Sequence, residues 1–299
     1  MSIKKTKSSL GYYWEIFKQS ISKFIEDDIF THAAALSYYT IFSLPPMILI
    51  ILFTTGLFYD KETIKASLFE QIGSLVGKGG AEQLLFTIEK FNVFEPTLWA
   101  TALGFGVMAF TSTTVFITMQ NALNIIFKVK PTATGYAIIK LVKDRILSFT
   151  LLIGVGFILM VSLVVNTLVA EFGKYLEGQF GYASYVLNFM TNILLPFFIN
   201  TLLFAMIFKF LPDAKLRWKD TWFGAILTSV LFVIGKYLIS FYIGTSDVSG
   251  LYDAAGSIMV IMVWVFYASL IVMFGSVVTY CRMKINGDRI KASDFAEKA

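Results

Sequence analysis

The sequence predicts an all-α membrane protein with six transmembrane helices, an N-terminal interfacial amphipathic helix, and short outer helices between the first two spans. Three observations lead to this fold class. The chain of 299 residues is 57% hydrophobic and only 15% charged, whereas soluble domains carry about 25% charged residues. Its apolar residues gather in long runs, and its Lys and Arg residues fall between alternate runs. This pattern indicates a chain whose main solvent is lipid.

Six runs are long enough to cross a bilayer. A hydrocarbon core about 30 Å thick requires roughly 20 apolar residues in a helix. Helix is the expected state, because lipid offers no partner for the backbone groups of an open strand. The first run follows a polar start instead of a signal-peptide pattern, so we expect a retained span. The runs are residues 33–59, 98–118, 146–170, 186–211, 221–243 and 254–281.

The positions of Lys and Arg predict the orientation. Of the 25 such residues, 19 lie in the N-terminal arm, the second and fourth connections and the tail, and five lie in the other connections. The remaining one, Lys236, lies inside the fifth run. Because cytoplasmic loops carry the excess of positive charge, we expect both termini to be cytoplasmic.

Three segments outside the runs are amphipathic. Residues 62–76 and 81–91 are predicted to form two short helices in an outer cap spanning residues 60–97. Residues 13–28 are predicted to form a helix in the cytoplasmic interface, within an arm that covers residues 1–32. The transmembrane domain then covers residues 33–281 and the tail covers 282–299. The apolar face of the interfacial helix consists of Trp14, Phe17, Ile21, Phe24 and Ile25, and the polar face of Glu15, Lys18, Ser22, Lys23 and Glu26.

Several stretches carry a family resemblance that covers about residues 29–282. The most specific is Ser37-Tyr38-Tyr39 followed by Pro45-Pro46. The others are residues 120–124, 143–149, 208–214, 235–236, 252–257 and 274–275. In these stretches the chain resembles the BrkB/YihY family of bacterial inner-membrane proteins, which were formerly misassigned as ribonuclease BN.

The resemblance implies a multi-pass protein of the bacterial inner (plasma) membrane, proposed to transport lipids or lipid-linked envelope precursors. Two positions depart from the family pattern. Asp253 replaces a common Gly, and Gly275-Ser276-Val277 stands where many members end the sixth span with Gly-Ala-Glu. A role assigned to that Glu therefore does not carry over to this chain.

Lys236 is the most informative single residue. A cation within a span is costly and by default marks a functional site, here one that attracts an anionic headgroup or phosphate. The alternative interpretation is structural. Lys236 would then extend its ammonium group to the outer interface or pair with Asp247 or Asp253.

Polar residues also line two other runs. Asn188, Asn192 and Asn200 repeat at steps of four or eight, so they share one helix face, and Pro196 between them predicts a kink. Amides in lipid need partners, so this face is expected to point into the bundle, either as contacts between helices or as a polar pathway. Thr111 and Thr114 would add hydroxyl groups to the same interior.

In the first run, Tyr38 and Tyr39 precede Pro45-Pro46. This spacing predicts a bent helix, which either borders a binding site, as in transporters, or is a simple packing kink. In the basic second connection, Lys140, Lys143 and Arg145 are candidates for contact with anionic lipid headgroups.

These features favour a transporter or flippase-like protein for a lipid or other amphipathic anionic envelope substrate, with membrane lipids as partners. The alternative is a non-transporting scaffold or envelope-assembly factor. We expect no enzyme, cofactor, metal or nucleic-acid partner. The carboxylates are scattered, His32 is the only histidine, Cys281 is the only cysteine, and no phosphate-binding loop of an ATPase is present.

Overall fold

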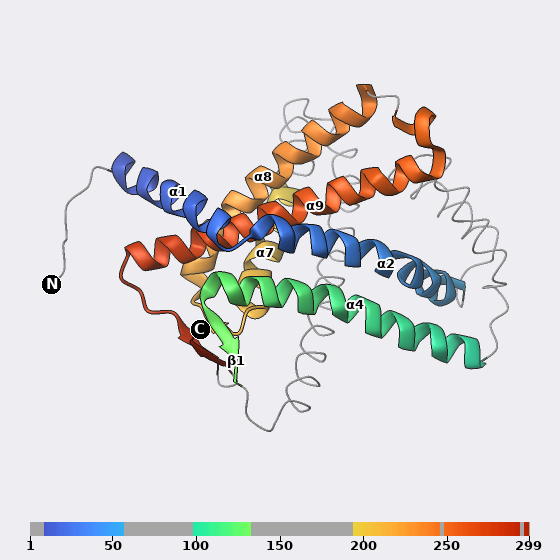
Figure 1. Cartoon of the computed structure of the whole chain (residues 1–299), viewed down its shortest axis with the longest axis horizontal. Helices are drawn as coiled ribbons and strands as arrows, with labels where there is room; N and C mark the ends of the chain where they lie inside the picture. The colour runs from blue at the N-terminus through green and yellow to red at the C-terminus, as the bar shows by residue number, and fades with distance from the viewer. Residues whose placement is uncertain (1–8, 57–97, 133–193, 246–247, 294–295, 299) are drawn as a thin grey trace, which may run out of the picture. The chain divides into compact units, whose positions relative to one another are not determined.

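The computed structural model describes residues 9–56, 98–132, 194–245, 248–293 and 296–298 (Figure 1). The predicted outer cap, the third run and the first part of the fourth run lie outside the described residues. The predictions made for those segments are therefore neither confirmed nor contradicted.

The described residues form helices joined by short connections with a few strand residues. This agrees with the all-α prediction. The helices are α1 (Ser9–Glu26), α2 (Ile29–Gly56), α4 (Leu98–Phe127), α7 (Leu195–Phe210), α8 (Trp218–Thr245) and α9 (Val248–Ile285), and the strands are β1 (Val129–Pro131), β2 (Ala214–Lys215), β3 (Lys291–Ala292) and β4 (Ala296–Lys298).

Several helices extend beyond the apolar runs that predicted them. A run ends where polar residues begin, whereas a helix ends where the backbone changes conformation. The helix predicted to end near residue 118 continues to Phe127 and is closed by Lys128, whose φ of 54° is left-handed. Asp28, with a φ of 50°, separates α1 from α2 in the same way.

One segment among the described residues, Met262–Ile285 of α9, is both long and apolar enough to cross a bilayer. Thr114–Phe127 and Leu195–Phe210 are apolar but shorter. The six spans therefore stay a prediction from the sequence.

The chain divides into two compact units, which are described separately below. Unit 1 comprises Met1–Ile29, Gln120–Val233 and Ile271–Ala299, and unit 2 comprises Phe30–Met119 and Ile234–Leu270. Helices α4, α8 and α9 each contribute residues to both units.

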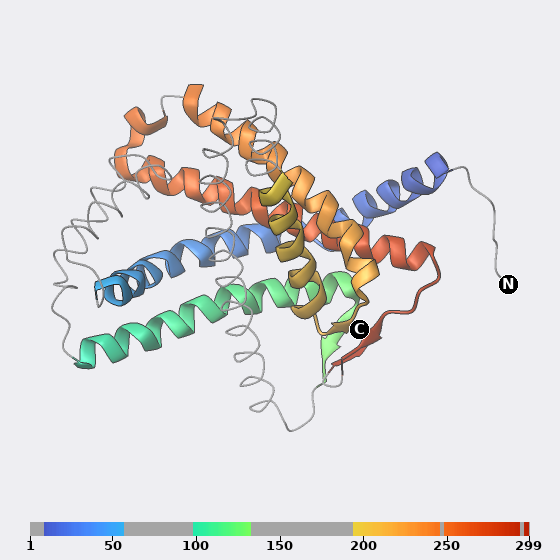
Figure 2. The ribbon, with the colours of Figure 1, turned by 180° about the vertical axis from the view of Figure 1, so that it is seen from behind.

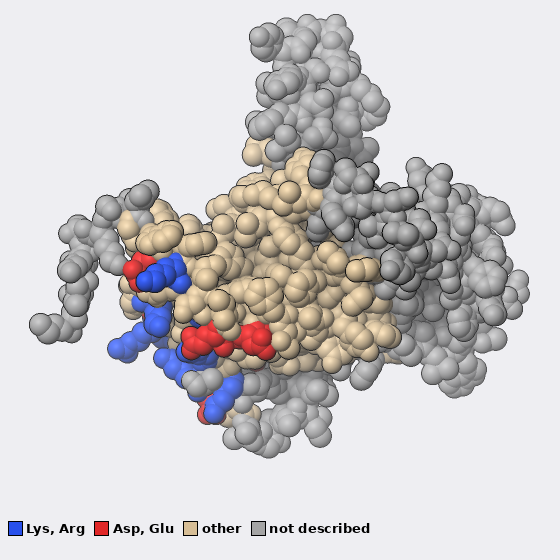
Figure 3. Space-filling model, turned by 45° about the horizontal axis from the view of Figure 1, so that its top comes forward, with Lys and Arg blue, Asp and Glu red and all other residues tan. Residues whose placement is uncertain are grey.

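The charged residues whose side chains are described lie in one unit. Every Lys, Arg, Asp and Glu whose side chain is described belongs to unit 1, and the described side chains of unit 2 include none. Figure 3 shows the charged side chains gathered on a limited part of the described surface, which is otherwise uncharged in that view. Unit 2 also contains charged residues, such as Lys61 and Lys236, whose side chains lie outside the described atoms.

In unit 1, α8 and α9 pack closely through a reciprocal pair of glycines and threonines. A Cβ atom at Gly224 would collide with Thr279 Oγ1, and one at Gly275 would collide with Thr228 Oγ1. Each threonine hydroxyl donates a hydrogen bond to the carbonyl oxygen of the glycine four residues earlier in its own helix, at 2.8 Å for Thr228 and 2.9 Å for Thr279. Gly224 and Gly275 therefore allow α8 and α9 to approach closely, as small residues commonly do between membrane helices.

The C-terminal tail joins three other segments of unit 1. Strand β4 pairs antiparallel with β1, and β3 pairs antiparallel with β2 (Figure 2). On the N-terminal arm, Tyr12 Oη donates to Asn286 Oδ1 at 2.8 Å. The described parts of the N-terminal arm, the second and fourth connections and the tail thus lie almost entirely in one unit. These are the segments that the distribution of Lys and Arg predicts to lie on the same side of the membrane. The cytoplasmic placement of that unit stays a prediction.

Asp213, in the connection between α7 and α8, is the polar centre of this assembly. Asn124 on α4 donates to one carboxylate oxygen at 2.9 Å, and Gln120 donates to the other at 3.3 Å. The backbone N–H of Asp213 donates to Asn124 Oδ1 at 2.7 Å, and its carbonyl oxygen accepts from the N–H of Ser293 at 2.9 Å. One residue thus links α4, the α7–α8 connection and the tail.

We predict that Gly224→Ala destabilises the protein by about 1–3 kcal/mol, because the new Cβ would lie 2.5 Å from the backbone carbonyl oxygen of Gly275, which cannot rotate away. The matched control is Gly106→Ala in α4, where nothing lies within 4 Å of the added atom. Thermal unfolding of the purified protein in detergent should show a lower midpoint for the first variant only. Equal midpoints would contradict the close contact.

We also predict that Asn124→Ala lowers the free energy of unfolding by about 1–3 kcal/mol. The substitution removes the hydrogen-bond partners of both the carboxylate and the N–H of Asp213. Asn121→Ala, at an exposed position on the same helix, should change stability little. Limited trypsin digestion offers a second measurement, in which the tail should be cut faster in the first variant than in the second. Similar cutting rates would argue against the Asp213 junction.

Candidate functional site

Lys236 lies deep within α8. It is 18 residues after Trp218 and nine before Thr245, so it is roughly 27 Å from one end of the helix axis and roughly 13 Å from the other. Its side chain is outside the described atoms, and so are the side chains of its proposed partners Asp247 and Asp253. Its helical position places a cation within an otherwise apolar stretch.

The residue before it, Gly235, lies against α9 in unit 2. The ring of Tyr267 occupies the space in which a side chain at position 235 would lie. Tyr267 in turn stacks on Trp264, with ring centroids 6.4 Å apart and planes 28° apart. Gly235, the residue before Lys236, is therefore held against the Tyr267 ring of the neighbouring helix.

Helix α2 meets the same stretch of α9. The hydroxyl of Ser37 is buried and donates a hydrogen bond to the carbonyl oxygen of Met262 at 2.8 Å. Met262 precedes Tyr267 by five residues, which is roughly 8 Å along a helix. Helices α2 and α8 therefore contact α9 within about one and a half turns of each other.

The next two residues of α2, Tyr38 and Tyr39, are exposed. Tyr38 packs against Phe42, with ring centroids 4.7 Å apart, and against Tyr39 at 5.8 Å. Together they form an aromatic surface with hydroxyl groups at its edge. Tyrosine is suited to such a boundary, because its ring is apolar and its hydroxyl is polar.

We define the candidate site as this part of unit 2. Three of the residues selected from the sequence lie on the two helices that contact α9 here: Tyr38 and Tyr39 on α2, and Lys236 on α8. The site adds residues that sequence reasoning did not select. The site consists of Ser37, Tyr38 and Tyr39 of α2, Gly235 and Lys236 of α8, and Met262, Trp264 and Tyr267 of α9.

The remaining predicted residues are not placed in this site. Asn200 is half-buried on α7 in unit 1. Thr114 is half-buried on α4 in unit 2, and its carbonyl oxygen accepts a hydrogen bond from Thr118 Oγ1 at 2.9 Å. Thr111 lies in α4 without a described side chain. The rest lie outside the described residues: Asn188, Asn192, Lys140, Lys143 and Arg145.

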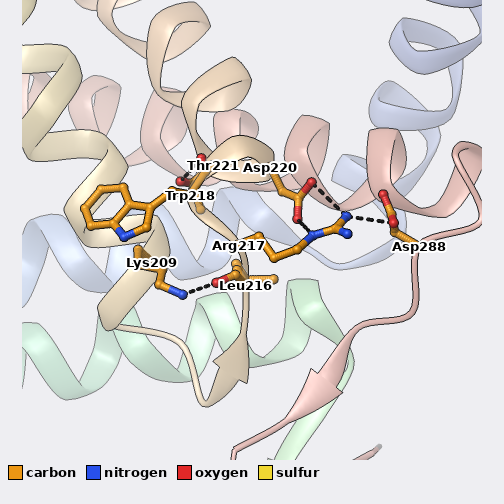
Figure 4. Close-up of polar contacts among 7 residues, drawn as sticks. All are labelled: Lys209, Leu216, Arg217, Trp218, Asp220, Thr221 and Asp288. Atoms are coloured by element: carbon orange, nitrogen blue, oxygen red, sulfur yellow. Dashed lines mark hydrogen bonds and ion pairs between the residues drawn. The ribbon is translucent and has the colours of Figure 1, made fainter.

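The start of α8 is held by a polar network in unit 1 (Figure 4). Arg217 donates to both carboxylate oxygens of Asp220, at 2.7 and 3.1 Å, and to Asp288 at 2.7 Å. The hydrogen bond from Asp220, followed by that from Asp288, raises the pKa of the Arg217 guanidinium further above its ordinary value. Lys209 donates to the carbonyl oxygen of Leu216, and Thr221 Oγ1 donates to that of Trp218 at 2.9 Å. These contacts hold the start of α8 within unit 1.

The described side chains of the candidate site offer tyrosine hydroxyls and aromatic faces, and Lys236 supplies a cation on the same stretch of α8 by its position in the sequence. This set suits an anion that carries an apolar part, because the cation attracts the charge and the rings contact the remainder. No group of three or more His, Cys, Asp or Glu residues that could hold a metal ion occurs among the described residues.

Comparison with known proteins identifies the family. Residues 20–297 match the family described as virulence factor BrkB. The chain belongs to the BrkB family. Two of the stretches that suggested this resemblance, residues 120–124 and 208–214, meet at the Asp213 junction, and a third contains the Gly235-Lys236 pair.

Relatives in the BrkB family are known as membrane proteins. The chain is 26% identical to a UPF0761 membrane protein of Aeromonas salmonicida, in a match covering 87% of this chain and 86% of that protein. It is 22% identical to one of Ralstonia nicotianae, with 85% and 55% covered, and 25% identical to one of Pseudomonas aeruginosa, with 85% and 59% covered. The chain thus spans little more than half the length of the latter two. No solved structure matches it.

We predict that Gly235→Ala destabilises the protein by about 1–3 kcal/mol, because the added methyl group would overlap the Tyr267 ring. The same change in a Tyr267→Ala background should cost much less, since the ring is then absent. A double-mutant cycle of unfolding midpoints in detergent measures this coupling. If Gly235→Ala has the same effect in both backgrounds, the two residues do not touch.

Proposed function

We propose that this member of the BrkB family is a multi-pass transporter or flippase-like protein of the bacterial inner membrane. Its substrate would be a lipid or another amphipathic anionic molecule of the envelope, and both termini would be cytoplasmic. Lys236 is the observation that carries the proposal: a cation in the interior of an apolar helix, next to a glycine held against Tyr267.

The energetic argument starts from the cost of that cation. A Lys at the centre of a span costs about 2.5–3.5 kcal/mol on insertion scales, and an anionic partner would offset this cost. A phosphate headgroup would supply that partner. The exposed rings of Tyr38 and Phe42 on α2 would contact the apolar part of the same molecule.

The proposed activity is transport and not catalysis. The sequence contains no phosphate-binding loop of an ATPase, so movement would follow a gradient or depend on a partner. The proposed partners are membrane lipids, with no nucleic acid involved. The lipid-headgroup role of Lys140, Lys143 and Arg145 belongs to the same proposal.

A scaffold or envelope-assembly factor is the second candidate. The observation that favours it is the tail, which joins β1 and β2 through strand pairing and Arg217 through Asp288. Such a closed assembly would suit a protein that holds partners in place. The experiment below separates the two functions.

We expect purified protein in liposomes to accelerate the movement of fluorescent phosphatidylglycerol between leaflets, measured by dithionite quenching. Lys236→Met should slow this movement about tenfold or more, because one charge-assisted contact with the phosphate is lost. Lys236→Arg should retain most of the rate, since the positive charge remains. Fluorescent phosphatidylethanolamine, which has no net charge, should depend less on Lys236.

Two results would count against the proposal. If wild-type liposomes quench no faster than protein-free ones, this phospholipid is not transported and the scaffold function is favoured. If Lys236→Met moves phosphatidylglycerol as fast as the wild type, Lys236 does not contact the substrate. Far-UV circular dichroism of each variant controls for folding.

A further inference from the structure

Helix α1 runs antiparallel along the end of α9 in unit 1. Tyr12 Oη donates to Asn286 at 2.8 Å, while twelve residues later Phe24 packs against Phe274, with ring centroids 5.7 Å apart. Between them, the Lys23 ammonium lies 4.3 Å from the centre of the Tyr280 ring. The helix is therefore held at several points, which fixes its rotation about its own axis.

The face that α1 turns toward the protein is partly polar. Ile16, Ser20 and Lys23 are buried, at steps of four and three residues. Lys23 also forms an ion pair with Asp27 at 2.6 Å, and both side chains are less than one-tenth exposed. The sequence placed Lys23 on the water-facing side of the helix. That prediction was wrong, because the cation finds Asp27 and the Tyr280 ring within the protein.

The face that α1 turns outward is apolar. Trp14, Phe17, Ile21 and Ile25 are all exposed, with 66% of Trp14 and 68% of Ile25 accessible. They follow one another at steps of three and four residues and form one stripe along the helix, which we call the α1 stripe. Trp14 stacks on Phe17, with centroids 6.0 Å apart.

A third face is polar. Glu15 accepts a hydrogen bond from Gln19 at 2.9 Å, and Ser22 and Glu26 are exposed further along the same side. The helix thus has one face on the protein, one apolar face and one polar face. A helix at the surface of a water-soluble protein has only the first and the third.

The rotation of α1 is the reverse of what water would favour. In water, a helix lowers its free energy by turning its large apolar side chains inward and its lysines outward. Here Lys23 is inside, while a tryptophan, a phenylalanine and two isoleucines are outside. This setting is favourable when the stripe faces apolar surroundings, as it does among lipid acyl chains.

We propose that the α1 stripe is inserted among the acyl chains at the edge of a phospholipid bilayer. The position of the helix supports a lipid partner, because α1 packs on the last turns of Met262–Ile285, the described segment able to cross a bilayer. Exposed Lys18 and Lys284 lie on these two helices and suit anionic headgroups. This lipid contact is independent of the proposed transport.

The test uses spin labels on two adjacent residues of the full-length protein in nanodiscs of phosphatidylethanolamine and phosphatidylglycerol. Cys281, the only cysteine, is buried and is replaced with alanine. Labels at Ile21→Cys, in the stripe, and at Ser22→Cys, on the polar face, differ by one position in sequence. Both positions are exposed, so both variants should fold.

We expect the label at Ile21→Cys to collide several-fold more with oxygen, which concentrates in lipid, than with a water-soluble nickel chelate. The label at Ser22→Cys should show the opposite ratio. Preferential collision with the chelate at position 21 would place the stripe in water and overturn the proposal. Low collision with both reagents would place it against protein, such as a second copy of the chain, and would overturn it equally.

Discussion

The close approach of α8 and α9 is the constraint on which most of the described structure depends. In unit 1, Gly224 and Gly275 leave no room for a side chain at either position, and in unit 2 Gly235 leaves none beside Tyr267. Between apolar helices in lipid, association depends on van der Waals contact and hydrogen bonds, so small residues at the interface have a large effect. Helix α9 also contacts three other helices. In unit 1, its Phe274 and Tyr280 contact α1, and Phe127 of α4 packs on Tyr280. In unit 2, the carbonyl oxygen of Met262 accepts a hydrogen bond from Ser37 of α2.

Polar groups connect segments of unit 1. Three of the polar groups discussed above contact segments that are distant in sequence. Asp213 joins α4 to the tail, Arg217 joins the start of α8 to Asp288, and Lys23 lies between Asp27 and the Tyr280 ring. Burying a polar group without a partner costs about 1–3 kcal/mol, so these pairings select one arrangement of the connections and the tail.

Lys236 differs from these residues, because it lies inside an apolar run of the sequence and within α8. The proposed function rests on that position. A residue needed only for topology would be expected among the charges of the connections. A cation in the interior of α8, one residue after the contact of Gly235 with Tyr267 of α9, is the reason for proposing an anionic molecule at this site.

The amino-acid sequence by itself determined the helical class, the family and the residues able to carry charge within an apolar run, because composition and periodicity record which solvent each segment meets. It also selected Lys236, Tyr38 and Tyr39. It did not select Tyr267, because nothing in the pattern of one apolar helix shows which residue of another will fill the space beside a glycine 32 residues away. The sequence also placed Lys23 on the polar, exposed face of α1, whereas Lys23 is buried. Helical periodicity separates polar from apolar residues, but it does not show which polar residues are buried against another helix. Only the tertiary structure decided these points, since they depend on contacts between segments that are distant along the chain.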